Sequence, residues 1–231
     1  MKVSSIIIEK YNMLCLHYNI IADSCYKKRK SMTQALSDEY IKYVIAALIV
    51  FDMQRQMSKG LETKYDMNTT GFANALRQSL NLIKNELISL ELYSICDIDL
   101  DKEKNTIEKI YNQINDDIKA AMTNNNKSKN FDVGVTKILH FLHPDLFPII
   151  DSNAANILKK YFGINYKTGT HGYSAEKYIK SMKKIQNYIN EINCESFKRL
   201  EKGTPLTRIF DKITFITNMN EKKKKQQNDM T

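Results

Sequence analysis

Apolar residues recur at steps of three and four along much of this chain, and this spacing is the feature that most limits how it can fold. One face of an α-helix has this period, whereas a half-buried strand alternates every second residue. No segment alternates long enough to predict a strand. The sequence therefore predicts an all-α fold. The clearest helical series are Phe72, Leu76, Leu80, Ile83 and Leu87, and then Ile107, Ile110, Ile114 and Ile118.

Glycines and prolines lie between the periodic segments and divide the chain into predicted helices. The helices are expected at about residues 4–25, 37–57, 70–87, 102–122, 132–143, 152–162, 174–193 and 205–218. The apolar run Val44–Phe51 predicts that the second of these is the central buried helix. The last is expected to close the fold by docking on the core.

A polar stretch at residues 123–130 predicts a boundary between two helical halves. Residues 1–122 would form the N-terminal half and residues 131–219 a basic C-terminal half. The lysine-rich residues 220–231 have almost no apolar side chain, so we expect them to form a disordered tail.

The chain has a formal net charge of +9, and this charge is unevenly distributed. Residues 118–231 carry twenty basic and ten acidic side chains, whereas residues 85–117 carry three basic and nine acidic ones. A strongly basic half predicts a surface for a polyanion, and double-stranded DNA is the expected partner. A solvated lysine-rich surface without a partner is the alternative. The sequence does not identify a protein partner.

The four cysteines, Cys15, Cys25, Cys96 and Cys194, include no Cys-x-x-Cys pair, so they predict neither a zinc site nor an iron–sulfur centre. We expect reduced, mostly buried thiols, and no cofactor. No apolar run approaches the ~20 residues that cross a bilayer. Because the first ten residues also lack the pattern of a signal peptide, the expectation is a soluble intracellular protein of the cytoplasm or nucleoid, without membrane contact.

Residues 131–158 contain the most informative motif. The extended segment 147–150 includes a proline, which disfavours a helix there, and it leads directly to Asp151 at the start of the next predicted helix. At that position Asp151 is expected to cap the helix by accepting from the amide of Asn153 or Ala154.

This motif resembles part of a known family. Phe-Pro-Ile-Ile-Asp-Ser-Asn at 147–153 resembles the segment that carries the catalytic aspartate of helix-hairpin-helix DNA glycosylases, and Val-Gly-Val-Thr-Lys at 133–137 resembles their Gly-x-Gly-x-Lys hairpin. The resemblance implies a helix-hairpin-helix glycosylase-like fold, with Asp151 as a catalytic residue and Lys137 as the Schiff-base nucleophile of lyase-active members. Two hairpin glycines are replaced by valines, and the interval of fourteen residues from Lys137 to Asp151 is short for the family.

The residue types suit removal of a damaged or modified base from DNA, in repair or in defence against modified foreign DNA. Asp151 would stabilise positive charge on the deoxyribose, and a neutral Lys137 would attack C1′. A lysine that begins a helix in solvent is the structural alternative for Lys137. An extruded base also needs a pocket. The candidate substrate-binding residues are Gly134, Phe131, His140, Tyr161, Lys177, Lys180 and Lys184.

Other interpretations remain open at this stage. A non-catalytic nucleic-acid-binding protein would have the same helices and charge, and a helical protein-interaction module would use the acidic segment 85–117 to bind a basic partner. His140 and His143 have the i, i+3 spacing of two metal ligands, but no partner pair of ligands accompanies them. No metal site is therefore predicted, and both histidines are expected to be exposed at a helix end.

Overall fold

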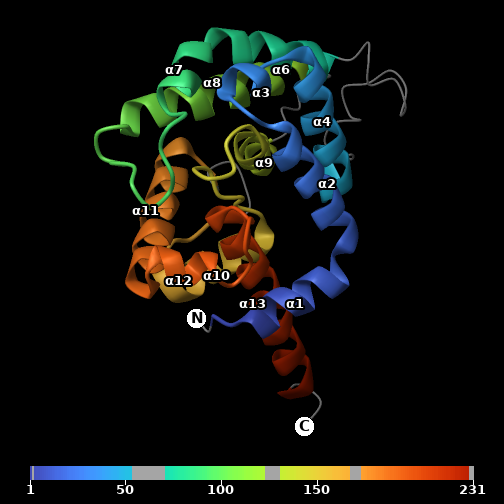
Figure 1. Cartoon of the computed structure of the whole chain (residues 1–231), viewed down its shortest axis with the longest axis vertical. Coiled ribbons are helices and arrows are strands. Elements are labelled where there is room, and N and C mark those ends of the chain that lie inside the picture. Colours follow the sequence, from blue (N-terminus) through green and yellow to red (C-terminus); the bar gives the residue numbers. More distant parts are fainter. Residues whose placement is uncertain (2, 54–70, 123–130, 167–172, 229–231) are drawn as a thin grey trace.

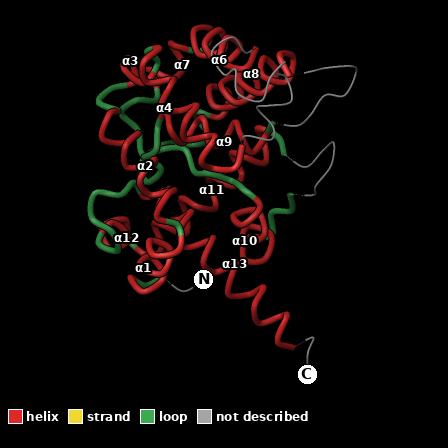
Figure 2. Tube along the Cα trace, turned by 90° about the vertical axis from the view of Figure 1, so that its right-hand side faces the viewer, coloured by secondary structure: helices red, strands yellow, loops and turns green. Residues whose placement is uncertain are grey.

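The computed structural model describes residues 1, 3–53, 71–122, 131–166 and 173–228. Within these ranges every regular element is a helix and there is no strand, so the predicted all-α class is confirmed for them (Figures 1 and 2). Figure 1 shows one group of helices above and another below a helix that is viewed end-on near the centre.

The N-terminal part begins with two helices where the sequence predicted one, because the helical conformation is interrupted at Cys15. Two later helices begin at serine caps: Ser31 accepts from the amide of Gln34, and Ser37 from that of Tyr40. Such caps satisfy amides that have no partner within the helix. The elements are α1 (Ser5–Leu14), α2 (Leu16–Lys28), α3 (Met32–Ala35), α4 (Asp38–Leu48) and the π-helical η1 (Ile49–Met53).

The upper group in Figure 1 includes α6 (Gly71–Leu82), α7 (Lys84–Ser89) and α8 (Lys104–Met122). The nine residues of the two apolar series identified from the sequence lie in or beside these helices, and each is at most 3 % exposed. Because α6 packs along α8, each helix buries the stripe of the other. Helical periodicity therefore predicted this part of the core correctly.

The central helix is α9 (Asp132–Leu142), and the prediction that the second helix occupies this place is wrong. Every residue of α9 except Val133 is buried, whereas Ile45 and Ala46 of α4 remain partly exposed. The reason is position: α2, α4 and α8 all pack against α9, so it has neighbours on every side.

The C-terminal part contains α10 (Ser152–Phe162), α11 (Ala175–Ile192), α12 (Cys194–Lys198) and α13 (Leu206–Asn228). As predicted, α13 docks on the core, and it packs against α1 and α10. It continues to Asn228, so the expected disorder from residue 220 is not found as far as that residue. Lysine and glutamine are good helix formers and extend a helix that packing has already nucleated. Its last turns project from the body (Figures 1 and 2).

The two predicted halves share one hydrophobic core. Buried residues from α2, α4, α6 and α8 form a single cluster with those of α9, α11 and α13. The first and last helices also meet, since α1 packs against α13. Within the described ranges, no helix is long and apolar enough to cross a membrane.

The prediction of four reduced thiols is wrong for two of them. Cys15 and Cys25 are free and buried, but Cys96 and Cys194 form a disulfide across 98 residues of sequence. A disulfide depends on how close two cysteines lie in the fold, which their spacing in the sequence does not reveal.

Candidate active site

Lys137 and Asp151 lie in the wall of one pocket with a volume of about 290 Å³. Lys137 comes from α9, and Asp151 immediately precedes α10. A third ionisable residue, Asp211 of α13, also lines the pocket. Its aromatic lining is Tyr11, Tyr18, Phe51 and Phe215.

Lys137 is buried rather than exposed at a helix start, with only 7 % of its surface accessible. Its Nζ donates to the backbone oxygen of Phe51 at 2.5 Å and lies 5.7 Å from the centre of the Phe51 ring. Burial of an ammonium group is costly without such partners. The carbonyl oxygen belongs to η1, and π-helical turns inside helices often occur at functional sites.

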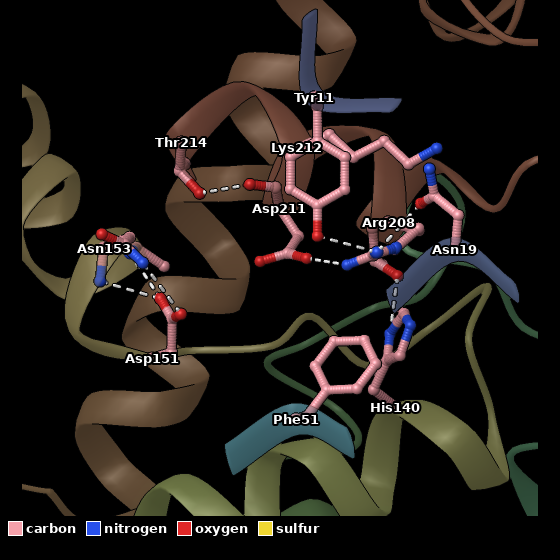
Figure 3. Close-up of polar contacts among 12 residues, drawn as sticks. Tyr11, Asn19, Phe51, His140, Asp151, Asn153, Arg208, Asp211, Lys212 and Thr214 are labelled. Atoms are coloured by element: carbon pink, nitrogen blue, oxygen red, sulfur yellow. Dashed lines mark hydrogen bonds and ion pairs between the residues drawn. The ribbon is translucent and has the colours of Figure 1, made fainter. Parts of the chain in front are cut away.

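Asp151 caps α10 as the sequence predicted. Its Oδ1 accepts from the backbone amides of Asn153 at 2.8 Å and Ala154 at 2.9 Å, and its Oδ2 accepts from Nδ2 of Asn153 at 3.2 Å (Figure 3). These bonds fix the orientation of the carboxylate at the pocket wall.

Asp211 forms a buried ion pair with Arg208, one helical turn earlier on α13. Nη2 of Arg208 donates to the hydroxyl of Tyr11 at 2.9 Å and to Oδ1 of Asn19 at 3.2 Å. The guanidinium lies 5.0 Å from the ring centre of Tyr11 and 5.3 Å from that of Phe51. Figure 3 shows one oxygen of Asp211 bonded to Arg208 and the other on the side of Asp151.

The pKa of Asp211 is raised to about 6. Burial is the main cause, and the negative charge of Asp151 adds to it, while the cations of Arg208 and Lys137 act in the opposite direction. Burial alone would lower the pKa of Arg208, but the Asp211 carboxylate keeps it above its ordinary value. Arg208 therefore stays charged, and Asp211 can exchange a proton near neutral pH.

Sequence reasoning did not identify Arg208, Asp211 or Tyr11 as site residues. The segment 204–212 was interpreted as a helix that docks through apolar side chains, and it does so. The available signal was that Arg208 and Asp211 flank Ile209 and Phe210 on a helix predicted to be buried, so some charges had to enter the core.

Gly134 and Phe131 do not line the pocket, so the structure does not bring these two predicted substrate-binding residues to it. Gly134 is buried inside α9. A Cβ at Gly134 would lie 2.3 Å from the ring of Phe131, which is itself fully buried against Phe72. The glycine is required here because an aromatic ring approaches its backbone closely, not because the segment forms a phosphate-binding turn.

The two histidines are also buried, in contrast to the prediction. His140 accepts at Nε2 from the hydroxyl of Tyr26 at 2.6 Å and donates from Nδ1 to the backbone oxygen of Phe147 at 2.9 Å. Desolvation lowers the pKa of His140 to about 3 and that of His143 to about 4. Both are neutral core residues. Within the described ranges no three His, Cys, Asp or Glu side chains converge as metal ligands.

The remaining candidates lie outside the pocket. Tyr161 is 42 % exposed and donates to a carboxylate oxygen of Glu221 at 2.8 Å. Lys177, Lys180 and Lys184 are on α11, and none of them lines the pocket.

A lysine-lined hollow of about 450 Å³ lies between α10 and α13. Asn218 at its edge donates from Nδ2 to Oδ1 of Asn153 at 2.7 Å, and Asn153 lines the pocket that contains Asp151. The hollow and the pocket are therefore neighbours. The lysines of the hollow are Lys159, Lys160, Lys222 and Lys225.

Comparison with family models, curated proteins and solved structures gave no match. The functional assignment therefore rests on the geometry and chemistry of the site.

Proposed function

We propose that this protein cleaves the N-glycosidic bond of a damaged or modified nucleotide in DNA, with the Lys137–Asp151 pocket as its active site. One observation carries the proposal: a buried lysine and two carboxylates converge on a single small pocket with aromatic walls. Its volume, about 290 Å³, is just below the ~300–1,000 Å³ typical of ligand sites, which suits one extruded base rather than a larger ligand.

Asp151 would provide the counter-charge. Loss of the base leaves positive charge on the deoxyribose, and a fixed carboxylate stabilises this charge without having to reorganise. The two backbone amides that hold Oδ1 supply this fixed geometry. Tyr18, Phe51 and Phe215 offer apolar surface to a base that has left the helical stack.

Lys137 would act as the nucleophile once its ammonium has lost a proton. Asp211 is suited to accept that proton, because its pKa is about 6 and it interacts electrostatically with Lys137. The amine forms a bond to C1′ as the bond to the base breaks, and the base leaves with the bonding electrons and takes up a proton. Opening of the sugar ring then yields an imine.

The DNA backbone would follow the lysine-lined hollow between α10 and α13. Four lysines there face one glutamate, Glu221, which pairs with Lys160 at 2.6 Å. Uncompensated lysines beside a pocket bind phosphates and so position a nucleotide. This interface replaces the one predicted at Gly134 and on α11.

The test measures base release and covalent trapping on duplexes with defined base lesions or an abasic site, in the presence of borohydride. We expect Asp151→Asn to lower base release by orders of magnitude and to cost only about 1 kcal/mol of stability, because the amide oxygen can still cap α10. Lys137→Gln should abolish the borohydride-dependent adduct.

Asp116→Asn is the matched control, because Asp116 is exposed on α8 and its substitution removes the same charge as Asp151→Asn does. It should behave as the wild type does. Full base release by a folded Asp151→Asn variant would refute the proposal. DNA binding with no base release on any lesion would instead favour the non-catalytic DNA-binding protein.

A further inference from the structure

A separate cavity of about 780 Å³ lies between the end of α2, α12 and the start of α13, and the proposed active site does not use it. Its lining has more positive than negative charge. Four cationic side chains and two carboxylates face it: Arg29, Lys198, Arg199 and Lys202, with Asp145 and Glu195.

Arg29 lines this cavity, and its guanidinium is held in place. Its Nε donates to the backbone oxygen of Leu142 at 2.6 Å, which fixes the guanidinium. Its Nη2 is buried and has no hydrogen-bond partner. Arg29 therefore adds a fixed positive charge to the wall of the cavity.

The carboxylates of the cavity do not neutralise its cations. Glu195 accepts from Nζ of Lys198 at 2.8 Å, but no ion pair involves Arg199 or Lys202 in the part of the chain that is described. The pKa of Asp145 is raised by desolvation, although Arg29 and Lys198 oppose this. The cavity therefore favours an anion with more than one negative charge.

The remaining lining indicates the size and class of that anion. Tyr26, Pro144 and Leu206 provide apolar surface, and the volume is far larger than a single phosphate requires. The first turn of α13, at Leu206, adds the positive end of a long helix. We propose that this cavity binds a nucleoside polyphosphate, with the phosphates at Arg29, Arg199 and Lys202 and the nucleoside on the apolar wall.

The disulfide fixes two walls of this cavity. Cys96 lines it directly, and its partner Cys194 is the first residue of α12, which carries Lys198. Reduction would release α12 from the loop that contains Cys96. Ligand affinity should therefore fall in the presence of a reductant, since a pre-organised site loses less entropy on binding.

Isothermal titration calorimetry of the full chain tests this proposal, with ATP, inorganic pyrophosphate and adenosine as probes. We expect ATP to bind at one site, pyrophosphate to bind more weakly, and adenosine not to bind. Arg199→Gln with Lys202→Gln should weaken ATP binding by about tenfold or more, since two charge-assisted contacts are lost. Both residues are exposed, so the variant should fold.

The matched control is Lys42→Gln with Lys84→Gln, which removes the same charge from exposed positions on α4 and α7. It should leave the affinity for ATP unchanged. Absence of binding by both ATP and pyrophosphate at millimolar concentration would overturn the proposal, as would equal weakening in the two double variants. Displacement of ATP by a single-stranded oligonucleotide would assign the cavity to a nucleic-acid surface instead.

Discussion

Two buried histidines should make this protein sensitive to acid. His140 is 0 % exposed and His143 is 2 % exposed, and desolvation lowers their pKa values to about 3 and about 4 from an ordinary 6.5. The unfolded chain therefore binds more protons than the folded chain once the pH falls below about 6.5. The stabilisation that comes from these neutral rings is complete above that pH. It is lost as the pH falls toward the pKa values of the two histidines in the folded state.

The expected size of the effect follows from the two shifts. Between pH 7 and pH 4 the histidines together lower the free energy of unfolding by about 6 kcal/mol. Asp211 acts in the opposite direction, because its pKa is raised to about 6 in the folded state. The stabilisation that comes from the raised pKa of Asp211 is complete below the pKa of the unfolded state and is lost as the pH rises through 6. As the pH falls from 7 to 4 the folded state therefore gains about 2 kcal/mol from Asp211, which offsets part of the loss caused by the histidines. For these three groups the loss is about 4 kcal/mol, which is a large part of the stability of a typical domain. Asp132 and Asp145, whose pKa values are also raised by burial, act in the same direction as Asp211 and reduce the loss further.

Urea denaturation at several pH values between 7 and 4, followed by far-ultraviolet circular dichroism, measures this loss directly. His143→Gln should remove about 3 kcal/mol of this loss, because glutamine does not titrate in this range. Glutamine can still donate to the backbone oxygen of Leu90, as Nε2 of His143 does at 3.1 Å. His17→Gln is the control, since His17 is exposed. A free energy of unfolding that stays constant from pH 7 to 4, or an equal effect of the two substitutions, would refute this reasoning.

Two further substitutions test the packing around the site. Gly134→Ala should lower the free energy of unfolding by about 1–3 kcal/mol, because the new methyl group would overlap the ring of Phe131; an unchanged melting temperature would contradict this. Arg208→Met should cost about 3–5 kcal/mol, since it leaves the carboxylate of Asp211 buried and unpaired, and adding Asp211→Leu should restore most of this stability in a denaturant titration. A double variant that is no more stable than the single one would contradict the second prediction.

Much of the fold was predictable because helical packing leaves a local signal. The stripes of α6 and α8 and the cap of α10 depend on residues that are close in sequence, and all three were predicted correctly. The centre of the fold was not, because burial of α9 depends on α2, α4 and α8, which come from other parts of the chain. The Cys96–Cys194 bond is non-local for the same reason.

The site shows the same division. Lys137 and Asp151 were identified from a local motif, and the structure brings both to one pocket. Gly134 belongs to that motif too, yet its role depends on the ring of Phe131, which the pattern does not reveal. Asp211 comes from a helix sixty residues after Asp151, and only packing of α10 against α13 brings the two carboxylates together.

Stability alone does not account for the charges at this pocket. A buried ion pair such as Arg208–Asp211 is expensive to desolvate, and well-packed apolar side chains of similar volume usually give equal or greater stability. The surrounding core offers such a solution, since Ile209, Phe210 and Ile213 on the same helix are fully buried. Arg208 instead pairs with Asp211 at the wall of a cavity, where burial and the charge of Asp151 raise the pKa of Asp211 to about 6 although Arg208 opposes this. Groups with such perturbed pKa values are concentrated at catalytic sites, and this is the reason that we propose chemistry in the pocket.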